Sequence, residues 1–191
     1  MSNVQEGLEH SVRSLLKLLS PDYEDDLNLR ETPRRFAKIL EEYFKSEEEI
    51  EHEIKQLFSS IFPSSIDQLV IAKDIDVWML CPHHLLPVNM KVNIGYLPKG
   101  FVVGYSKLHR LAKLVAKRPR LQEDYTNIVA DKLMENLRPL GTMVVVLGKH
   151  LCTAMRGVRD SDSKLITSAV RGDFLRFPDL KSEFLRLLRV D

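Results

Sequence analysis

The chain has 191 residues, of which 44% are hydrophobic, and its 28 basic and 27 acidic residues give a net charge of +1. This composition is typical of a globular protein, and the length is enough to bury a core without disulfides or oligomerisation. The two cysteines exclude a disulfide scaffold, and because no apolar run approaches about 20 residues, a membrane span is excluded as well.

The N-terminal residues show no targeting signal and then helical periodicity. Residues 1–10 are polar and acidic, where a secretion signal would be basic and then apolar, so we expect a cytoplasmic protein with reduced thiols. Leucine and valine recur at helical spacing over residues 4–19, which predicts an amphipathic helix that ends before Pro21.

Two further helices are predicted before residue 63. Thr32 suits the N-cap, and Pro33 the first helical position, of a helix that continues through Tyr43. The acidic run Glu47–Glu49 suits the positive N-terminus of a third helix. We therefore expect a helical N-terminal region over residues 1–62, followed by a catalytic domain over residues 63–191.

The middle of the chain changes to a period of two. Residues 68–80 and 88–97 are rich in valine, isoleucine and aromatic residues, and the second run alternates apolar with polar side chains, so both are predicted strands. Pro98-Lys99-Gly100 is typical of a turn. Residues 101–105 are therefore expected to return antiparallel to the strand over 88–97, as a hairpin.

Helices and strands then alternate to the C-terminus. Ser106 is expected to cap a helix that Pro119 ends, and a further helix is predicted over residues 122–137. Residues 142–147 and 165–170 are predicted strands, and residues 179–188 a final helix. This order of elements indicates an α+β fold with segregated antiparallel strands.

Charge is strongly segregated along the sequence. Residues 77–122 contain eight basic side chains and no carboxylate. Such a stretch indicates either a solvated basic helix face or a site for an anion, and charge alone does not choose between them. A nucleic-acid polymer is a poor fit, because the whole chain is not basic and only 7% of it is aromatic.

Both cysteines have histidine neighbours after predicted strands. Cys81 and His84 form a C-x-x-H pair, and Cys152 follows the later strand. Thiolate and imidazole are the ligands that Zn²⁺ prefers, and three protein ligands leave one tetrahedral position open, as hydrolysis requires. The alternative is two free thiols in the core with incidental histidines.

Two more histidines stand beside these candidate ligands. His83 and His150 are suited to proton transfer, because imidazole titrates near neutral pH. The structural alternative is that they only orient the ligands through hydrogen bonds.

Several short motifs occur in the order seen in GTP cyclohydrolase I, and the chain resembles that family over roughly residues 29–189. The motifs are Cys81-Pro82-His83-His84-Leu85-Leu86-Pro87, Gly95-Tyr96-Leu97-Pro98, Ser106-Lys107-Leu108-His109-Arg110, Gln122-Glu123, His150-Leu151-Cys152 and Met155-Arg156-Gly157-Val158-Arg159. Each motif is short, but their joint order and spacing are specific.

The resemblance implies a zinc-dependent hydrolysis of GTP. It assigns Cys81, His84 and Cys152 to Zn²⁺, which would activate water for attack on C8 of guanine. His83 and His150 would move protons while the imidazole ring opens and C8 leaves as formate. The product would be 7,8-dihydroneopterin triphosphate, for tetrahydrofolate, pterin or deazapurine synthesis.

The same resemblance assigns substrate contacts. Glu123 would accept hydrogen bonds from the ring N–H and the exocyclic amine of guanine, with Gln122 assisting. The ribose and triphosphate would be held by Ser106, Lys107, Arg110 and Arg156. Without the resemblance, the favoured interpretation of Glu123 is a charge that complements the positive N-terminus of its helix.

For the whole molecule, the resemblance implies the tunnelling fold, an antiparallel sheet backed by two helices. It also implies a homodecamer of two stacked pentamers with active sites between subunits. The chain departs from the family at Pro82, where glutamate is usual, and at Arg120 and Asp124, where glutamine and arginine are common. Two alternatives stay open: a zinc hydrolase for another purine nucleotide, and a non-catalytic nucleotide-binding ring.

Overall fold

The computed structural model describes residues 3–189. The chain divides into two compact units, residues 1–45 and 46–191. No helix within the described residues is long and apolar enough to cross a membrane.

The first unit is a pair of helices, α1 (Asn3–Leu19) and α2 (Thr32–Tyr43), which pack on each other. Val12, Tyr23 and Ala37 are its buried side chains of apolar character. Thr32 was expected to cap α2, but it is the first helical residue, and Glu31 occupies the N-cap without a side-chain bond. Pro33 nevertheless sits in the first turn, where its missing N–H costs nothing.

The second unit begins with α3 (Glu47–Leu57), which the sequence analysis had grouped with the N-terminal helices. Ser46 and Glu49 form a reciprocal capping box at its start. Ile50 and Ile54 are buried in the same core cluster as the strands of the sheet. The apolar face of α3 is therefore covered within the second unit.

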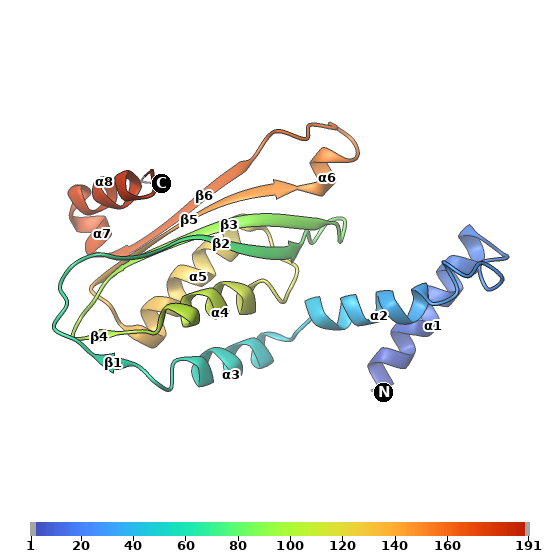
Figure 1. Ribbon diagram of the computed structural model, residues 1–191, viewed down its shortest axis with the longest axis horizontal. Coiled ribbons are helices and arrows are strands. Elements are labelled where there is room, and N and C mark those ends of the chain that lie inside the picture. The colour runs from blue at the N-terminus through green and yellow to red at the C-terminus, as the bar shows by residue number, and fades with distance from the viewer. Residues whose placement is uncertain (1–2, 190–191) are drawn as a thin grey trace. The chain divides into compact units, whose positions relative to one another are not determined.

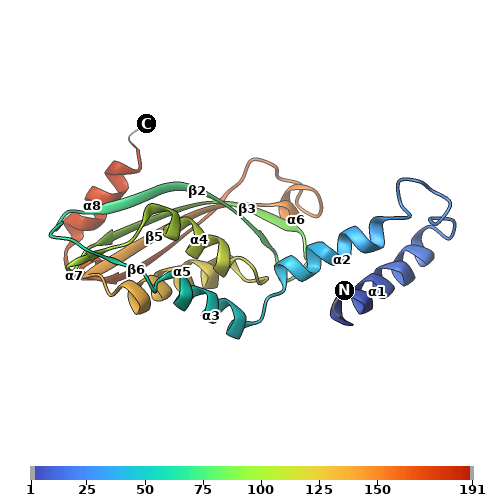
Figure 2. The ribbon, with the colours of Figure 1, turned by 60° about the horizontal axis from the view of Figure 1, so that its bottom comes forward.

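A four-stranded antiparallel sheet forms the centre of this unit, in the order β2-β3-β5-β6. The strands are β2 (Val70–Leu80), β3 (Pro87–Leu97), β5 (Gly141–His150) and β6 (Leu165–Gly172). Two long helices, α4 (Tyr105–Val115) and α5 (Gln122–Leu137), cover one face, as Figures 1 and 2 show. This is the expected α+β tunnelling-fold arrangement.

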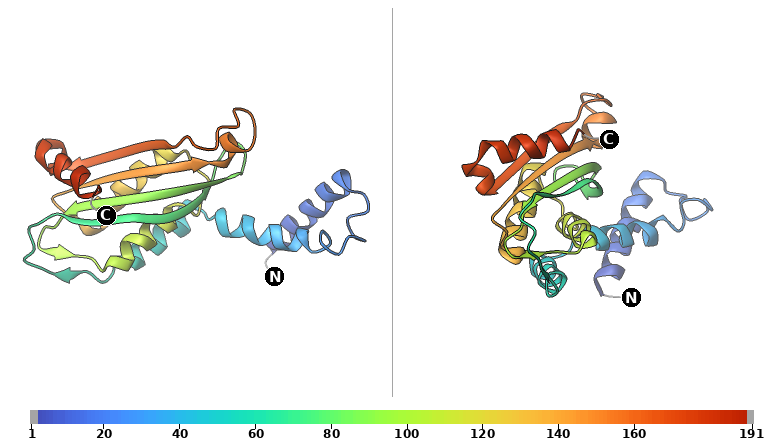
Figure 3. Two further views of the ribbon diagram at one scale, coloured as in Figure 1. Left: turned by 45° about the horizontal axis from the view of Figure 1, so that its top comes forward. Right: turned by 60° about the vertical axis from the view of Figure 1, so that its left-hand side comes forward.

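Strand β5 buries side chains on both faces of the sheet, which explains its continuous apolar run. Val144 and Val146 join the core cluster beneath α4 and α5. Met143 and Val145 point the other way, as successive strand residues must, and pack with Phe174 and Phe184. Those aromatic residues belong to α7 (Asp173–Arg176) and α8 (Pro178–Leu187), near the opposite face (Figure 3).

The expected hairpin between residues 88–97 and 101–105 does not form. Strand β4 (Phe101–Val102) pairs instead with β1 (Phe62–Pro63) in a separate two-stranded sheet. The physical reason is that β3 already has β2 on one side and β5 on the other, so it offers no free edge. The turn itself is present, with Gly100 at a φ of +74°.

The start of α4 also differs from expectation. Gly104, not Ser106, occupies its N-cap, and no side chain caps the helix. The remaining predicted helices and strands are confirmed, with ends shifted by one to three residues. A short helix, α6 (Leu151–Ala154), follows β5 directly.

Candidate functional site

Two of the candidate ligands lie in the tight connection between β2 and β3. The Cys81 backbone N–H donates to the Leu86 carbonyl and the Leu85 N–H to the Cys81 carbonyl, each at 2.9 Å. Leu85 adopts a left-handed conformation with φ +53°. The turn brings His84 back towards Cys81, and Pro82 fits within it because neither of these bonds needs its missing N–H.

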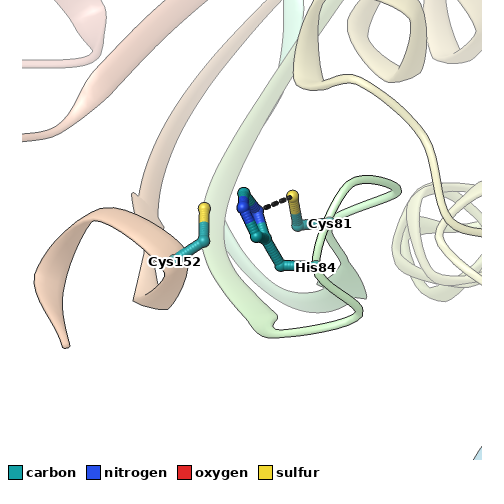
Figure 4. Close-up of side chains that lie close together, drawn as sticks. All are labelled: Cys81, His84 and Cys152. Atoms are coloured by element: carbon teal, nitrogen blue, oxygen red, sulfur yellow. Dashed lines mark hydrogen bonds between the residues drawn. The ribbon is translucent and has the colours of Figure 1, made fainter. Parts of the chain in front are cut away.

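The third ligand reaches the same place from another strand. Val88 of β3 pairs with His150 of β5, so the start of one strand lies beside the end of the other. Cys152 follows in α6. Figure 4 shows its side chain converging with those of Cys81 and His84, with the imidazole between the two sulfurs.

The spacing of these three side chains fits a tetrahedral zinc ion. Their ligand atoms all lie within 4.8 Å of one another. Cys81 Sγ and His84 Nδ1 are 3.7 Å apart. Zinc bonds of about 2.3 Å to sulfur and about 2.1 Å to nitrogen would place these atoms roughly 3.6 Å apart. The set therefore matches a metal centre with one open position.

The thiols themselves favour a cation. Burial raises the pKa of the Cys152 thiol, and the neighbouring Cys81 raises it further. Two thiolates side by side repel each other in a low-dielectric site, and a divalent cation removes that repulsion. The donor set therefore suits a metal that binds thiolate.

Each of the two candidate proton-transfer residues is a neighbour of a candidate ligand. His83 is exposed, and its ring stands edge-on to that of His84, with 6.1 Å between centroids. His150 is half-buried and immediately precedes the helix that carries Cys152. Burial lowers the pKa of His150, while the negative charge of Glu123 opposes this shift.

Gln122 and Glu123 begin α5 next to His150, but their side chains differ in exposure. Glu123 is exposed. Gln122 is only 1% exposed, and its amide is hydrogen-bonded within the protein. Its oxygen lies 2.9 Å from His150 Nε2.

The basic candidates of α4 lie at the other end of the sheet. The Val103 N–H, just before α4, donates to the hydroxyl of Tyr96 near the end of β3. The Cys81 N–H instead donates to the carbonyl of Leu86, just before the start of β3. Strand β3 has 11 residues. At about 3.3 Å per residue it separates these ends by roughly 30 Å. Ser106 and Lys107 follow Val103 closely, and Arg110 is one helical turn further on.

Arg156, by contrast, stays near the metal cluster in the chain. It is exposed in the loop that follows α6, four residues after Cys152. A hydrogen bond from the Asp160 N–H to the Thr153 carbonyl folds this loop back on α6. One chain thus gathers the three candidate ligands, both candidate proton-transfer histidines and Glu123, but not the basic residues of α4.

A cavity of about 350 Å³ opens beside His150. Its lining residues are Gly148, His150, Thr153, Ser163, Lys164 and Leu165. Ser163 and Lys164 are not among the site residues that the sequence predicts. The available signal was a polar run just before the last strand, and this is also typical of an ordinary loop.

Comparisons with known proteins identify relatives of this chain. A family model described as GTP cyclohydrolase I matches residues 8–189. The chain is 42% identical over 188 residues to GTP cyclohydrolase 1 of Bacillus pumilus, covering 98% of this chain and 97% of that protein. It is 43% identical over 187 residues to GTP cyclohydrolase 1 of Clostridioides difficile, covering 96% of each. Among solved structures, the archaeosine synthase QueF-Like in its apo form overlaps 57% of this chain and 97% of its own, at 19% identity and a TM-score of 0.45.

Proposed function

The chain belongs to the GTP cyclohydrolase I family and is an enzyme of that family, and we propose that it uses zinc to convert GTP and water to 7,8-dihydroneopterin triphosphate and formate. The convergence of Cys81, His84 and Cys152 carries this proposal. The product would enter tetrahydrofolate, pterin or deazapurine synthesis.

The three converging residues would hold the metal. A zinc ion bound there would act as a Lewis acid and lower the pKa of water. The open fourth position leaves room for a reacting group, and no further cysteine or histidine among the described residues completes a closed four-ligand site. This favours a catalytic role over a structural one.

The neighbouring residues supply proton transfer and base recognition. The His83 ring lies next to that of His84, and His150 immediately precedes the helix that carries Cys152, so each would exchange protons with the opening imidazole ring. Glu123 is exposed at the start of α5, beside His150. Its carboxylate would accept from the ring N–H and the exocyclic amine of guanine, a pattern that adenine does not offer.

The triphosphate requires cations that one chain does not bring to its own metal cluster, except Arg156. We therefore propose that Ser106, Lys107 and Arg110 serve the site of a neighbouring subunit. A ring of identical chains satisfies this, because each metal end then meets a basic end. The proposed assembly is a homodecamer of two stacked pentamers.

The test is turnover of GTP by the zinc-loaded protein, with formate and the fluorescent neopterin derived from the product measured together. We expect both signals with GTP and much less of either with ATP, and we expect neither from Cys152→Ala. Formate without a pterin would limit the activity to ring opening. Equal use of ATP and GTP would reject guanine recognition and favour a hydrolase for another purine nucleotide. Neither signal with zinc demonstrably bound would overturn the proposal in favour of a non-catalytic ring.

A further inference from the structure

The side chain of Gln122 is held in a single orientation by groups that only accept hydrogen bonds. Its Nε2 lies 3.0 Å from the Leu165 carbonyl oxygen and 3.3 Å from that of Val146. Turning the amide over would aim its oxygen at these two carbonyls, which have no hydrogen to share. The NH₂ group therefore faces the strands, and Oε1 faces His150.

This orientation fixes the hydrogen on His150. Gln122 Oε1 and His150 Nε2 are 2.9 Å apart, which is hydrogen-bond distance. An amide oxygen can only accept, so Nε2 must carry the hydrogen. In a neutral imidazole the other nitrogen, Nδ1, is then the one with a free lone pair.

Two threonines support the amide from behind. Gln122 Nε2 also lies 3.1 Å from the Thr167 hydroxyl, which in turn lies 2.6 Å from that of Thr126. The Thr126 hydroxyl donates to the backbone carbonyl of Gln122 at 2.7 Å. Since its one hydrogen is used there, Thr167 must donate to Thr126 and accept from Gln122. Each hydrogen bond in this network therefore has a defined donor and acceptor, and each of its N–H and O–H groups has an acceptor.

Gly148 provides the space that the amide occupies. A Cβ atom built on Gly148 would overlap the Gln122 amide oxygen, and its other near neighbours are atoms of the same amide. Gly148 has an ordinary strand backbone, so a tight turn does not explain the glycine. The absence of a side chain at 148 therefore serves the placement of Gln122.

We propose that Gln122 is a positioning residue that holds His150 in the Nε2–H tautomer and so leaves Nδ1 as the proton acceptor. The catalytic consequence rests on the proposed function, in which His150 exchanges protons with the substrate. The tautomer itself does not depend on the reaction. The role differs from a direct contact between Gln122 and the substrate, because the amide is buried and already bonded within the protein.

The first experiment reads the tautomer in the zinc-loaded wild-type enzyme without any turnover. Long-range ¹H–¹⁵N correlation spectra of protein labelled at histidine, assigned with His150→Gln, distinguish a protonated from an unprotonated ring nitrogen. We expect protonated Nε2 and unprotonated Nδ1 at a pH where the ring is neutral. The opposite tautomer, or an even mixture, would overturn the proposal whether or not the protein hydrolyses GTP.

Variants then separate positioning from substrate binding. Gln122→Met keeps the length of the side chain, but its thioether is only a weak acceptor and cannot donate, so we expect loss of the tautomer preference. Zinc content should remain unchanged, kcat should fall about tenfold to hundredfold, and KM for GTP should stay within about twofold. A raised KM with unchanged kcat in Gln122→Met would instead make Gln122 a substrate contact.

A second pair of variants leaves Gln122 and His150 intact. Thr167→Val removes the hydroxyl that holds the amide and should weaken the tautomer preference and lower kcat. Thr142→Val is the matched control, because the buried Thr142 hydroxyl donates to the Gly95 carbonyl at 2.7 Å, far along the same strand from His150. It should lose a similar amount of stability and keep the tautomer and kcat. Equal changes in tautomer preference and kcat in the two variants would show that the network has only a structural role.

Discussion

Cys152 and His83 both lie at the candidate metal site, yet they should have separable roles. Removing one of three ligands lowers metal affinity steeply, so Cys152→Ala should lose zinc and all turnover. His83→Ala should keep zinc and lose turnover by about a hundredfold, because it removes only proton transfer. Zinc content measured by atomic emission beside formate release separates the two effects. Loss of zinc from His83→Ala would instead identify His83 as a ligand.

Under the proposed function, selection of guanine depends on Glu123. Glu123→Gln keeps the shape of the side chain but replaces one acceptor oxygen with a donor, which would face donors on the base. We expect kcat/KM for GTP to fall by a factor of about 100 or more, as for loss of a charged hydrogen-bond partner in a specific site. The measurement is steady-state kinetics with GTP and ITP.

Asp124→Asn is the matched control for this change, because Asp124 is the next exposed acidic residue on the same helix. It removes the same charge from the positive end of α5. Similar losses in both variants would show that Glu123 acts through charge alone, as a complement to the helix dipole.

Residue-level prediction succeeds where the information is local. The C-x-x-H spacing placed Cys81 and His84 within one turn, and the structure closes that turn with two backbone bonds. The internal bonding of Gln122 was out of reach, because its partners Val146, Leu165 and Thr167 lie 24 to 45 positions away in sequence. Only the strand register brings those groups together.

At the scale of elements, α3 is tied to the loop between α4 and α5 through Glu47. Arg120, whose side chain is 10% exposed, lies 2.7 Å from the Glu47 carboxylate. The hydrogen bond from Arg120 holds the pKa of Glu47 below its usual range, and burial opposes this. A carboxyl group whose pKa is lower in the folded state than in the unfolded state stabilises the fold at pH values above its unfolded-state pKa. This stabilisation is lost as the pH falls through the folded-state pKa.

Arg120→Gln should therefore lower the free energy of unfolding at neutral pH, by about 0.5 to 1 kcal/mol after allowing for solvent screening of the exposed Glu47. The difference from wild type should shrink in acid, where Glu47 is protonated in both proteins. Urea unfolding at fixed protein concentration and several pH values measures this. Arg118→Gln is the control, with a smaller effect expected because that side chain is 43% exposed and 3.3 Å from Glu47. A loss that does not depend on pH would exclude the ion pair as its cause.

The misplaced hairpin shows what element prediction cannot supply. Pro98-Lys99-Gly100 correctly indicated a turn, because glycine provides the positive φ. Local sequence does not say which strand edges are free, however, and β3 had both edges occupied. Residues 101–102 therefore pair with β1, which lies about 40 residues earlier in the chain.

At the scale of the whole molecule, the positive charge of the basic stretch is only partly neutralised within the fold. Lys91 pairs with Asp76 at 3.0 Å, and Arg120 pairs with Glu47, so part of the positive charge is neutralised within the fold. Lys107 donates to the Ser60 carbonyl at 2.5 Å. Arg110, Lys113 and Lys117 instead line a cavity of about 420 Å³ between α3 and α4. The structural interpretation therefore describes some residues of this stretch, and the anion-site interpretation stays a prediction for the others.

The separation between the metal end and the basic end of the chain leads to a prediction about assembly. Suppose that each site takes its metal ligands from one subunit and Arg110 from another. Cys152→Ala then removes a metal ligand from the first subunit, and Arg110→Ala removes the basic side chain from the second. Each variant alone should be inactive. Mixed rings assembled from equal amounts should regain about a quarter of wild-type activity, because random mixing pairs an intact metal end with an intact basic end in that share of sites. The variants are mixed by joint unfolding and refolding, and ring mass is checked by native mass spectrometry.

A control mixture decides whether such recovery reflects sharing between subunits. Cys152→Ala and His83→Ala both damage the metal end, so every chain in their mixture carries a defect there and no site should recover. Recovery in this control would mean that the metal end itself is assembled from two chains. If the first mixture stays inactive while the rings form normally, the site takes Arg110 from the chain that holds its metal. Strand β3 places the start of α4 about 30 Å from the metal end, and Arg110 lies only about 8 Å further along the helix. The remaining distance argues against that outcome, because no side chain can span it.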